Sequence, residues 1–375
     1  MDAETQYRIA RPEEVPLAAA LASEVFDKDM GAIFPHFLCE ANAEHLFVAV
    51  EDGRVVALVG IMPWKLHIAG CEVRATSMGA VCTRPEARGR GHASRLVDLA
   101  IGALERDGTE LLFVSGELPI YQKRGCAQAG ETRRLTFTPE QLRLLRDGSN
   151  VTVAVRTYRP GDEAEMAALN SREPAHFVRS PEEMGMLLRS GSYAGVLRAR
   201  QETLIAEYGG SMAGYAVFAI RGGRIDVVEC AGEEAAVVSL LEAAARGGDA
   251  RELAVVLAGR QAGWADRWIA ASGCRHESGP TPGTVRVVNL PKLWQSLQPY
   301  AVSRIGAEAQ RSVAIAEAPH GWRLQREDDV WFLDCRRAAA LLLNGAGVFP
   351  QGPLKEAMQP LLPLPFVNPY NLNYI

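Results

Sequence analysis

Residues 84–96, RPEARGRGHASRL, hold four arginines and two glycines in thirteen positions. They follow an apolar run, MGAVCT at 78–83, and lead into residues 92–107, where apolar side chains recur at helical spacing. Glycine lets a ligand approach the backbone closely, and the first N–H groups of a helix have no partner within the helix. The positive end of the helix dipole adds to the charge of the arginines. The stretch therefore predicts an anion-binding turn between a strand and a helix, suited to a pyrophosphate.

Two common phosphate-binding motifs do not fit this turn. No Gly-Lys-Ser/Thr follows it, as a Walker loop requires, and the glycines do not complete a GxGxxG pattern. The segment before the turn, residues 45–83, is typical of an antiparallel meander with turns at Asp52-Gly53 and Ala69-Gly70, rather than of a βαβ unit. Kinase and dinucleotide-binding functions are therefore disfavoured. A glycine-arginine turn without a ligand is the alternative for this stretch taken alone.

The composition limits the class of protein. With 375 residues the chain is too long for one ordinary core, and 48% hydrophobic and 23% charged residues are typical of a soluble protein. A net charge of −5 without a long basic run argues against a nucleic-acid partner. Seven cysteines without a CxxC pair indicate reduced thiols and no metal site. A polar N-terminus and the lack of an apolar run of ~20 residues predict a cytoplasmic protein with no membrane partner.

The order of predicted elements repeats along the chain. After the helix at 92–107 comes a buried-type strand at 111–116 and a short turn or helix that ends at Gly125. A strand and a helix in 153–170, three strands in 203–231 and a helix at 232–248 repeat the first order. We interpret this repetition as an internal duplication of the fold.

Beyond Pro280 and Pro282 the composition changes. A strand and a helix are predicted in 284–300, an antiparallel sheet in 312–335, and a helix in 336–345 with Gly345 as its C-cap. The last sixteen residues, PLLPLPFVNPYNLNYI at 360–375, contain no charged side chain. A solvated tail is typically polar and charged, so this one is expected to pack against the body of the protein.

The motifs around the turn resemble those of the GNAT acyltransferases. The pyrophosphate loop of that family, Arg/Gln-x-x-Gly-x-Gly/Ala after the fourth strand, is matched by Arg88 to Ala93. The downstream pattern Tyr-x-x-x-Gly-aromatic is matched from Tyr121 to Gly125, with Cys126 in the aromatic position. The layout of the whole chain resembles the enhanced-intracellular-survival (Eis-like) branch. That branch has an active GNAT domain, a degenerate second GNAT domain and a C-terminal domain resembling sterol carrier protein.

The resemblance implies an α/β (α+β) fold with two tandem GNAT-type domains, mixed and mostly antiparallel sheets, and a small α+β C-terminal domain. The implied division is 1–147 for the catalytic acyl-CoA-binding domain, 148–283 for the degenerate one and 284–375 for the sterol-carrier-like one. In the second copy, Glu233 and Glu234 occupy the start of the helix, where they would repel a phosphate. The tyrosine is also replaced there, by Ile269.

The implied activity is transfer of an acetyl group from acetyl-CoA, as cosubstrate, to a primary amine of a small molecule or peptide by direct attack. Homo-oligomerisation is left open. A non-catalytic acyl-CoA sensor or scaffold, and a lipid-binding protein acting through its C-terminal domain, are the alternatives. By resemblance, a backbone N–H near Val81 polarises the thioester carbonyl, Val81 and Thr83 pair with the pantetheine arm, and Tyr121 donates a proton to the thiolate. The implied acetyl-CoA-binding set is Val81, Cys82, Thr83, Arg88, Gly89, Arg90, Gly91, His92, Ala93 and Ser94.

The base has two candidates. Glu117 follows a strand and could act through water, although a solvated loop carboxylate is equally compatible. In the Eis-like relatives the C-terminal carboxylate reaches the active site, which implies the same role for Ile375 unless this terminus only seals a groove.

For the acceptor pocket we considered Glu24, Asp27 and Trp64, which could instead face solvent or belong to the core. His36 and His45 are interpreted as hydrogen-bonded structural histidines, and neither Cys82 nor Cys126 has a nearby His or Asp in the sequence that would make it a nucleophile.

Overall fold

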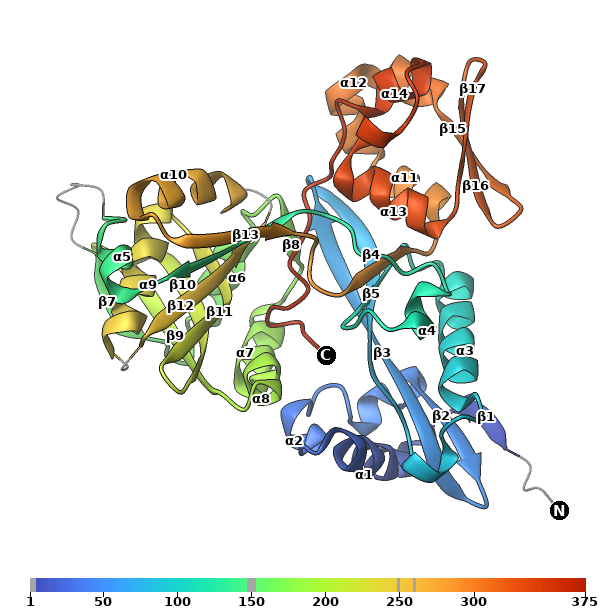
Figure 1. The fold of residues 1–375 in the computed structure, drawn as a ribbon, viewed down its shortest axis with the longest axis horizontal. Coiled ribbons are helices and arrows are strands. Elements are labelled where there is room, and N and C mark those ends of the chain that lie inside the picture. The colour runs from blue at the N-terminus through green and yellow to red at the C-terminus, as the bar shows by residue number, and fades with distance from the viewer. Residues whose placement is uncertain (1–4, 147–152, 248–249, 259–260) are drawn as a thin grey trace.

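The computed structural model describes residues 5–146, 153–247, 250–258 and 261–375. Two seven-stranded sheets with their helices lie side by side, and a smaller region with a three-stranded sheet stands at one end (Figure 1). This mixed α/β architecture confirms the predicted fold class. The proposed boundary between residues 147 and 148 lies outside the described residues. In the part of the chain that the structure describes, no helix combines the length and apolar character needed to span a membrane.

The first sheet has the strand order β1-β2-β3-β4-β5-β14, with β8 paired to β3. Its strands are β1 (Gln6–Ile9), β2 (Leu46–Glu51), β3 (Arg54–Ile68), β4 (Cys71–Thr83), β5 (Leu111–Val114), β8 (Ala175–Phe177) and β14 (Thr284–Val287). The expected meander of β2, β3 and β4 is present. However, β4 and β5 are parallel, so β4 and β5 with the helix between them form a βαβ unit. The strands before the glycine turn thus form the expected meander, while the turn itself lies within a βαβ unit, so only the glycine spacing argues against a dinucleotide motif.

Helices cover both faces of this sheet. They are α1 (Val15–Phe26), α2 (Met30–Ile33), α3 (His92–Asp107) and α4 (Pro119–Gln122), with 3-10 turns at Pro12–Glu14, Glu40–His45 and Pro85–Ala87. The predicted apolar stripe of α3, which includes Leu96, Ala100 and Leu104, is buried against β3 and its neighbours. Gly108 ends α3 with a φ of 75°, a conformation that favours glycine.

The second sheet repeats this layout in the order β13-β6-β12-β11-β10-β9-β7. Its strands are β6 (Thr132–Phe137), β7 (Ala154–Thr157), β9 (Arg200–Tyr208), β10 (Ser211–Arg221), β11 (Arg224–Gly232), β12 (Glu252–Leu257) and β13 (Arg275–Gly279). Its helices are α5 (Pro139–Arg143), α6 (Glu163–Asn170), α7 (Pro181–Ser190), α8 (Ser192–Val196), α9 (Glu234–Gly247) and α10 (Ala262–Ser272). As in the first sheet, a parallel pair, here β11 and β12, is joined by a helix, α9.

Besides β8, which pairs with β3, two further strands lie in the sheet of the other part of the chain. Strand β6 follows the first set of elements in the chain but pairs with β12 and β13 in the second sheet. Strand β14 follows the second set but pairs with β5 in the first sheet. The proposed division at 147 and 283 therefore divides the chain but does not separate the sheets.

The C-terminal region packs its helices on a small antiparallel sheet. Its elements are α11 (Leu290–Ser296), α12 (Gln298–Ser312), β15 (Ala314–Ala318), β16 (Gly321–Arg326), β17 (Asp329–Leu333), α13 (Cys335–Asn344), a 3-10 turn at Ala346–Val348 and α14 (Pro353–Met358). Gly345 caps α13, as predicted. An apolar cavity lined by Leu293, Leu342 and Phe366 measures only about 10 Å³. That space is too small for an acyl chain.

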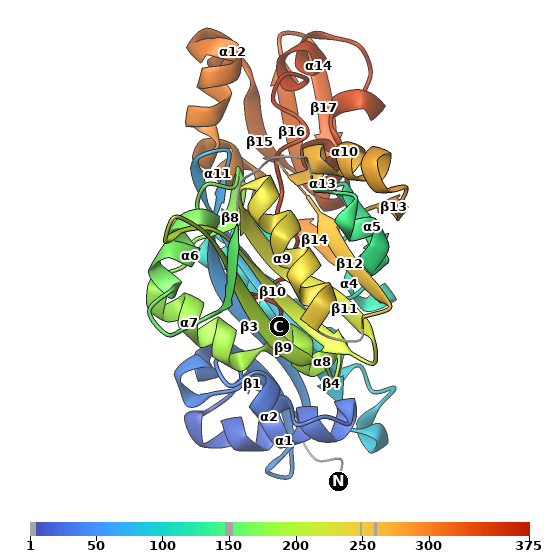
Figure 2. The same ribbon diagram turned by 90° about the vertical axis from the view of Figure 1, so that its left-hand side faces the viewer.

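The tail runs from the C-terminal region back between the two large sheets, and the chain ends near the centre of the molecule (Figures 1 and 2). Phe366 packs in the core of the C-terminal region. Leu372 packs with the core beneath the second sheet, and Ile375 with the core between α1, α2 and the first sheet. The tail therefore connects all three parts of the protein, and the prediction that it packs against the body is confirmed.

Candidate active site

The parallel strands β4 and β5 separate from each other at their carboxyl ends. Their last paired residues are Met78 and Val114, and beyond them β4 continues beside β3 as far as Thr83. Gly79 and Ser115, the next residue of each chain segment, therefore flank an opening between the two strands. In open sheets, such openings at the carboxyl ends of parallel strands are the usual place for a ligand.

A β-bulge shapes the β4 side of this opening. The pairs Leu58 with Cys82 and Gly60 with Gly79 leave two residues of β4 opposite one residue of β3. Ala80, in the bulge, has a φ of 50°, which is uncommon for a residue with a side chain. A bulge leaves the extra residue outside the ladder and changes the direction of its backbone groups. This is the segment where the sequence predicts that Val81 presents its N–H.

The glycine turn lies beyond the bulge, where α3 begins. Gly89 and Gly91 have φ values of 79° and 82°, and Gly91 is the N-cap of α3. No described side chain caps this helix start. A Cβ atom built on either glycine would meet no described atom within 4 Å. The backbone of the turn is therefore open to an approaching anion, as the sequence predicts.

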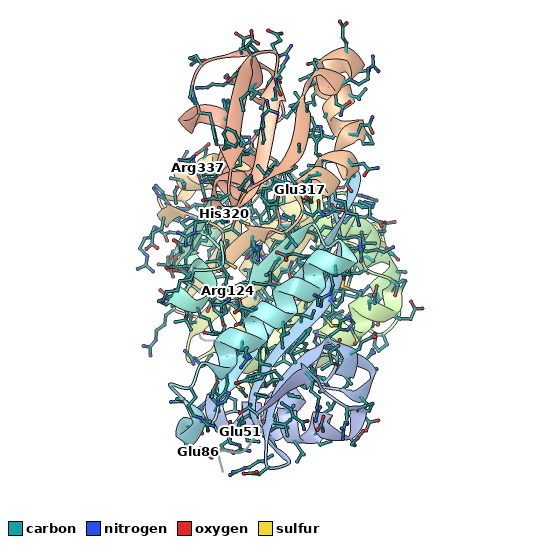
Figure 3. All side chains as sticks on the ribbon, turned by 90° about the vertical axis from the view of Figure 1, so that its right-hand side faces the viewer. Glu51, Glu86, Arg124, Glu317, His320 and Arg337 are labelled. Atoms are coloured by element: carbon teal, nitrogen blue, oxygen red, sulfur yellow. The ribbon has the colours of Figure 1, made fainter. Side chains whose placement is uncertain are left out.

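The charged side chains of the turn behave differently from one another. Arg88 is exposed, while Arg90 forms a bidentate ion pair with Glu51 at 2.6 and 2.9 Å, at the end of the molecule where Figure 3 labels Glu51. His92 is only 3% exposed, and its Nδ1 lies 2.8 Å from the hydroxyl of Tyr7. The side chain of His92 therefore supports the turn from inside, and only its backbone N–H is left for an anion. Ala93 and Ser94, the next predicted ligands, are half-buried.

The pKa values of three side chains in this region are shifted from their usual range. The Thr5 hydroxyl, followed by the Arg90 guanidinium, holds the pKa of Glu51 below its usual range, so this carboxylate stays ionised beside the turn. Burial raises the pKa of Cys82 to about 12 and that of Cys126 to about 11. Both thiols stay protonated near neutral pH, which agrees with the expectation that neither is a nucleophile.

Tyr121 lies on α4 beside the opening. Its side chain is 6% exposed, and its Cε2 would lie 3.2 Å from a Cβ atom built on Gly116. Burial raises the pKa of Tyr121 to about 12. The phenol is therefore protonated over the whole range in which most enzymes work, and it adjoins the segment that follows β5.

The C-terminal carboxylate lies in the opening itself. The Ser115 hydroxyl donates a hydrogen bond of 3.0 Å to an oxygen of Ile375. On the other side, a Cβ atom built on Gly79 would lie only 2.9 Å from the carboxyl carbon of Ile375. A glycine at position 79 therefore leaves the room that this carboxylate occupies between β4 and β5.

The remaining candidates lie around this opening or outside it. Glu117 is exposed, and its charge is one of the causes, after burial and two neighbouring tyrosines, that raise the pKa of Tyr370. Trp64 is half-buried at the junction of three apolar cores and donates from Nε1 to the Ser77 hydroxyl at 3.0 Å.

Two predicted acceptor contacts are not brought to the opening. Glu24 pairs with Arg84, and Asp27, whose side chain is 96% exposed, pairs with Arg198. The fold thus brings Gly79 and Ser115 to Ile375 and places Tyr121 against Gly116, the residue after Ser115; Gly79 and Ser115 were not among the residues predicted from the sequence. Their position could have identified them, because each directly follows the last residue at which β4 and β5 are paired.

The equivalent turn of the second unit is closed by its own atoms. A Cβ atom built on Gly232 would lie 2.3 Å from the carbonyl oxygen of Ala213, so the turn packs against β10. Glu234 pairs with Arg267 and accepts a hydrogen bond of 2.9 Å from Trp268 Nε1. Among the described residues, the backbone of this turn therefore faces β10 rather than an anion, and Arg267 is paired with Glu234.

Comparison with known proteins supports the GNAT part of the resemblance. Residues 6–129 match the family model described as the acetyltransferase (GNAT) domain, a range that includes β1 to β5, the glycine turn and α4. A comparison with curated protein sequences found no match.

Solved structures with a similar fold cover most of the chain. A GCN5-related N-acetyltransferase from Anabaena variabilis is 14% identical with a TM-score of 0.64, over 95% of this chain and 97% of that one. One from Kribbella flavida is 17% identical with a TM-score of 0.62, over 91% and 89%. Eis1 from Mycobacterium abscessus is 13% identical with a TM-score of 0.61, over 91% and 90%. At these identities the likeness concerns the fold, and it confirms that the fold is Eis-like.

Proposed function

We propose that this protein is an N-acetyltransferase that transfers the acetyl group of acetyl-CoA to a primary amine. One observation carries the proposal: a single opening between β4 and β5 is flanked by the β4 bulge, a protonated Tyr121 and the C-terminal carboxylate. The match of residues 6–129 to the GNAT acetyltransferase domain supports the same activity. The acceptor is a small-molecule or peptide amine.

The glycine turn fits the pyrophosphate of the cosubstrate. The backbone of Gly89 and Gly91 is open to an approaching group, and α3 begins there without a side-chain cap. These N–H groups and the helix dipole favour a bound anion. Arg88, which donates from Nε to the Thr83 carbonyl at 3.3 Å, is exposed and could add charge beside the turn, whereas Arg90 is held by Glu51. Val81, Cys82 and Thr83 continue along β4 from this turn toward the opening and would pair with the pantetheine arm.

The residues around the opening meet the three needs of the reaction. Acetyl-CoA would supply the acetyl group as a thioester. An alkylamine has a pKa of about 10, so it must lose a proton before it attacks, and the carboxylate of Ile375 would accept that proton. A backbone N–H near Val81 would stabilise the negative charge on the thioester oxygen, an effect worth ~3–4 kcal/mol for one such donor. Tyr121 would then donate its proton to the departing thiolate as the C–S bond breaks, and its phenolate would be reprotonated by the second proton that the attacking nitrogen loses.

The Ile375 carboxylate is favoured over Glu117 as the base because of where each carboxylate lies. Ser115 and Gly79 hold the Ile375 carboxylate between the strands, whereas Glu117 is exposed on the loop after β5. A general base has to lie within hydrogen-bonding reach of the amine, directly or through one water. Glu117 stays the second candidate, and the alternative acyl-CoA sensor would need neither group.

The experiment is a screen of amines with acetyl-CoA and the purified chain. CoA release is followed with a correction for thioester hydrolysis without acceptor, and mass spectrometry identifies acetylated products. Catalytic turnover with at least one class of amine is expected. Acetyl-CoA binding, measured by calorimetry, without turnover on a broad panel would support the sensor, and no binding would overturn the proposal.

A further inference from the structure

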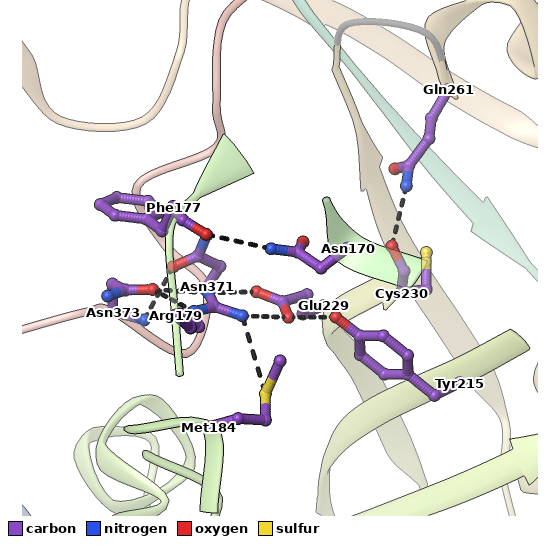
Figure 4. Close-up of polar contacts among 10 residues, drawn as sticks. All are labelled: Asn170, Phe177, Arg179, Met184, Tyr215, Glu229, Cys230, Gln261, Asn371 and Asn373. Carbon is purple, nitrogen blue, oxygen red and sulfur yellow. Dashed lines mark hydrogen bonds and ion pairs between the residues drawn. The ribbon is translucent and has the colours of Figure 1, made fainter. Parts of the chain in front are cut away.

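We propose that Arg179 and Glu229, two residues of the second unit, form a clamp that holds Asn373 and thereby positions the C-terminal carboxylate. The inference rests on the proposed role of Ile375 as base. By this inference, the second unit takes part in the reaction of the first unit, although its own turn at Gly232 is closed. The three residues come from the segment between β8 and α7, from β11 and from the tail (Figure 4).

Arg179 donates hydrogen bonds both to Glu229 and to Asn373 of the tail. Its Nη1 and Nη2 donate to the two carboxylate oxygens of Glu229 at 2.7 and 2.8 Å. Its Nε and Nη2 also donate to Oδ1 of Asn373, the former at 2.8 Å. Glu229 in turn accepts a hydrogen bond from the Tyr215 hydroxyl. Arg179 therefore holds the tail directly, and Glu229 holds Arg179.

The clamp is buried and ionised. The side chains of Arg179 and Glu229 are only 2% and 8% exposed. Burial alone would raise the pKa of Glu229, but the charge of Arg179 and the hydrogen bonds from Arg179 and Tyr215 together outweigh it and leave the pKa of Glu229 below its usual value. A buried ion pair is a weak source of stability, since apolar residues of similar volume often replace it without loss. Its retention here is better explained by the fixed geometry that its hydrogen bonds impose.

The orientation of Asn373 agrees with a positioning role. Arginine has no acceptor, so the amide must turn its oxygen toward Arg179. As a result, its buried Nδ2 has no partner among the described residues. An unpaired buried donor costs stability, which indicates that this contact is not optimised for stability. Asn373 is also only 1% exposed, so its position is fixed by the residues around it.

The clamp lies within reach of the catalytic end of the chain. Ile375 is two residues beyond Asn373, and two residues span at most about 7 Å. Tyr374, between them, packs against Phe34 of the first unit and Tyr193 of the second. The last three residues are therefore fixed by the clamp at one end and by Ser115 at the other. Since a misplacement of about 1 Å can cost about 10²-fold in rate, a loosened Asn373 would reduce catalysis without touching the substrates.

The first test is Asn373→Ala, which leaves the ion pair intact. We expect kcat to fall at least about tenfold, with little change in the KM for acetyl-CoA. We also expect carboxypeptidase to release Ile375 faster than from the wild type, as measured by intact mass. The matched control is Tyr300→Phe, which removes another hydrogen bond to the tail, from Tyr300 to the Leu361 carbonyl, far from the terminus. The control should keep wild-type kcat and protection.

The second variant, Arg179→Met/Glu229→Gln, removes the two charges together. It leaves no unpaired buried charge and keeps an acceptor for Tyr215, so folding is expected to survive. It should show the same loss of kcat and of protection as Asn373→Ala. Full kcat and full protection in both variants would overturn the clamp, and so would losses no larger than those of Tyr300→Phe.

A double-mutant cycle separates failure of the clamp from failure of the proposed base. Appending Gly-Ser after Ile375 moves the carboxylate, and in that background Asn373→Ala should cause no further loss of kcat. If the extension leaves activity unchanged, the base is elsewhere, while the carboxypeptidase result still decides whether the clamp holds the tail. If the extension lowers activity but leaves it measurable, and Asn373→Ala lowers kcat by an equal factor in both backgrounds, the clamp acts on something other than the carboxylate and the inference fails.

Discussion

The hydroxyl of Ser115 donates a hydrogen bond of 3.0 Å to the C-terminal carboxylate of Ile375, 260 residues further along the chain. Ser115 directly follows β5, where β5 separates from β4. Ile375 therefore lies inside the first sheet, next to the segment that leads to Tyr121. Whatever binds in this opening meets a charge that belongs to the chain end rather than to a side chain.

Appending Gly-Ser after Ile375 should reduce kcat/KM by roughly 10² or more, because it replaces the carboxylate with an amide and moves the charge out of the opening. The side chain of Ile375 stays available for its apolar contacts, so the melting temperature should change little. Steady-state kinetics and thermal denaturation of the two proteins measure both effects. Activity within about twofold of the wild type would move the role of base to Glu117.

Gly79→Ala provides the matching test from the strand side. Its new methyl group would lie 2.9 Å from the carboxyl carbon of Ile375, a contact that forces the chain end to move. We expect a loss of kcat in this variant as well. In the protein already extended by Gly-Ser, the same substitution should have a smaller effect on kcat, since the carboxylate is no longer there to be displaced.

Gly91→Glu should abolish acetyl-CoA binding, measured by calorimetry, because it places bulk and negative charge at the proposed phosphate site. Gly70→Glu is the matched control: both glycines have a φ of 82° and open space around a built Cβ atom. Both variants therefore carry the same backbone strain, about 1–2 kcal/mol, and only Gly91→Glu should lose affinity. Unchanged affinity in a folded Gly91→Glu protein would contradict the loop assignment.

The equivalent glycine of the second unit is not a suitable control, although the sequence repeat suggests it. Gly232 packs against the backbone of Ala213, so any side chain there would disturb β10 and β11. The duplication of elements is visible in the sequence, but how tightly each turn packs is not.

Local patterns predicted the elements of the first sheet well. The meander of β2, β3 and β4 follows from apolar alternation between two glycine turns, and α3 follows from its buried stripe and Gly108. The exchange of β6 and β14 could not be predicted, because it depends on pairing between segments more than a hundred residues apart. The parallel pairing of β4 with β5 could have been expected, since a helix joining two adjacent strands usually makes them parallel.

The candidate site, too, could be predicted only where it depends on local sequence. The open turn at Gly89 and Gly91 was predictable from glycine and arginine alone, and so was the packing of the uncharged tail. The ion pair of Arg90 with Glu51 was not predictable, because Glu51 lies on β2 and comes close to Arg90 only after folding. Arg179 and Asn373 are ordinary polar residues in loops, and nothing in the sequence links them.

His36→Leu should make the protein more resistant to acid. Both ring nitrogens of His36 are buried without a described partner, and burial lowers the pKa of His36 to about 4. Below about pH 6.5 the unfolded chain takes up a proton that the folded protein does not, so the free energy of unfolding falls toward pH 4. Urea unfolding at about pH 7.5 and 4.5 should show a drop smaller by about 2 kcal/mol in the variant. Equal drops in both proteins would mean that His36 is protonated in the folded state.

Tyr121→Phe should lower kcat by roughly 10²–10⁴ while the affinity for acetyl-CoA stays nearly constant. Phenylalanine keeps the ring that packs beside Gly116 and removes only the proton that the thiolate would receive. The pKa of Tyr121 is raised to about 12, so the wild-type phenol is protonated at every pH at which the enzyme is assayed.

The loss of kcat in Tyr121→Phe should therefore be the same from about pH 6 to pH 9, because the protonation of the phenol does not change across that range. Rate profiles of the two proteins over this interval, with calorimetry of acetyl-CoA binding at one pH, make the measurement. A loss that grows toward high pH would mean that the ionised phenolate acts in the wild type, as a base. An equal loss of affinity and rate would instead make Tyr121 a packing residue, and the thiolate would have to take its proton from another group.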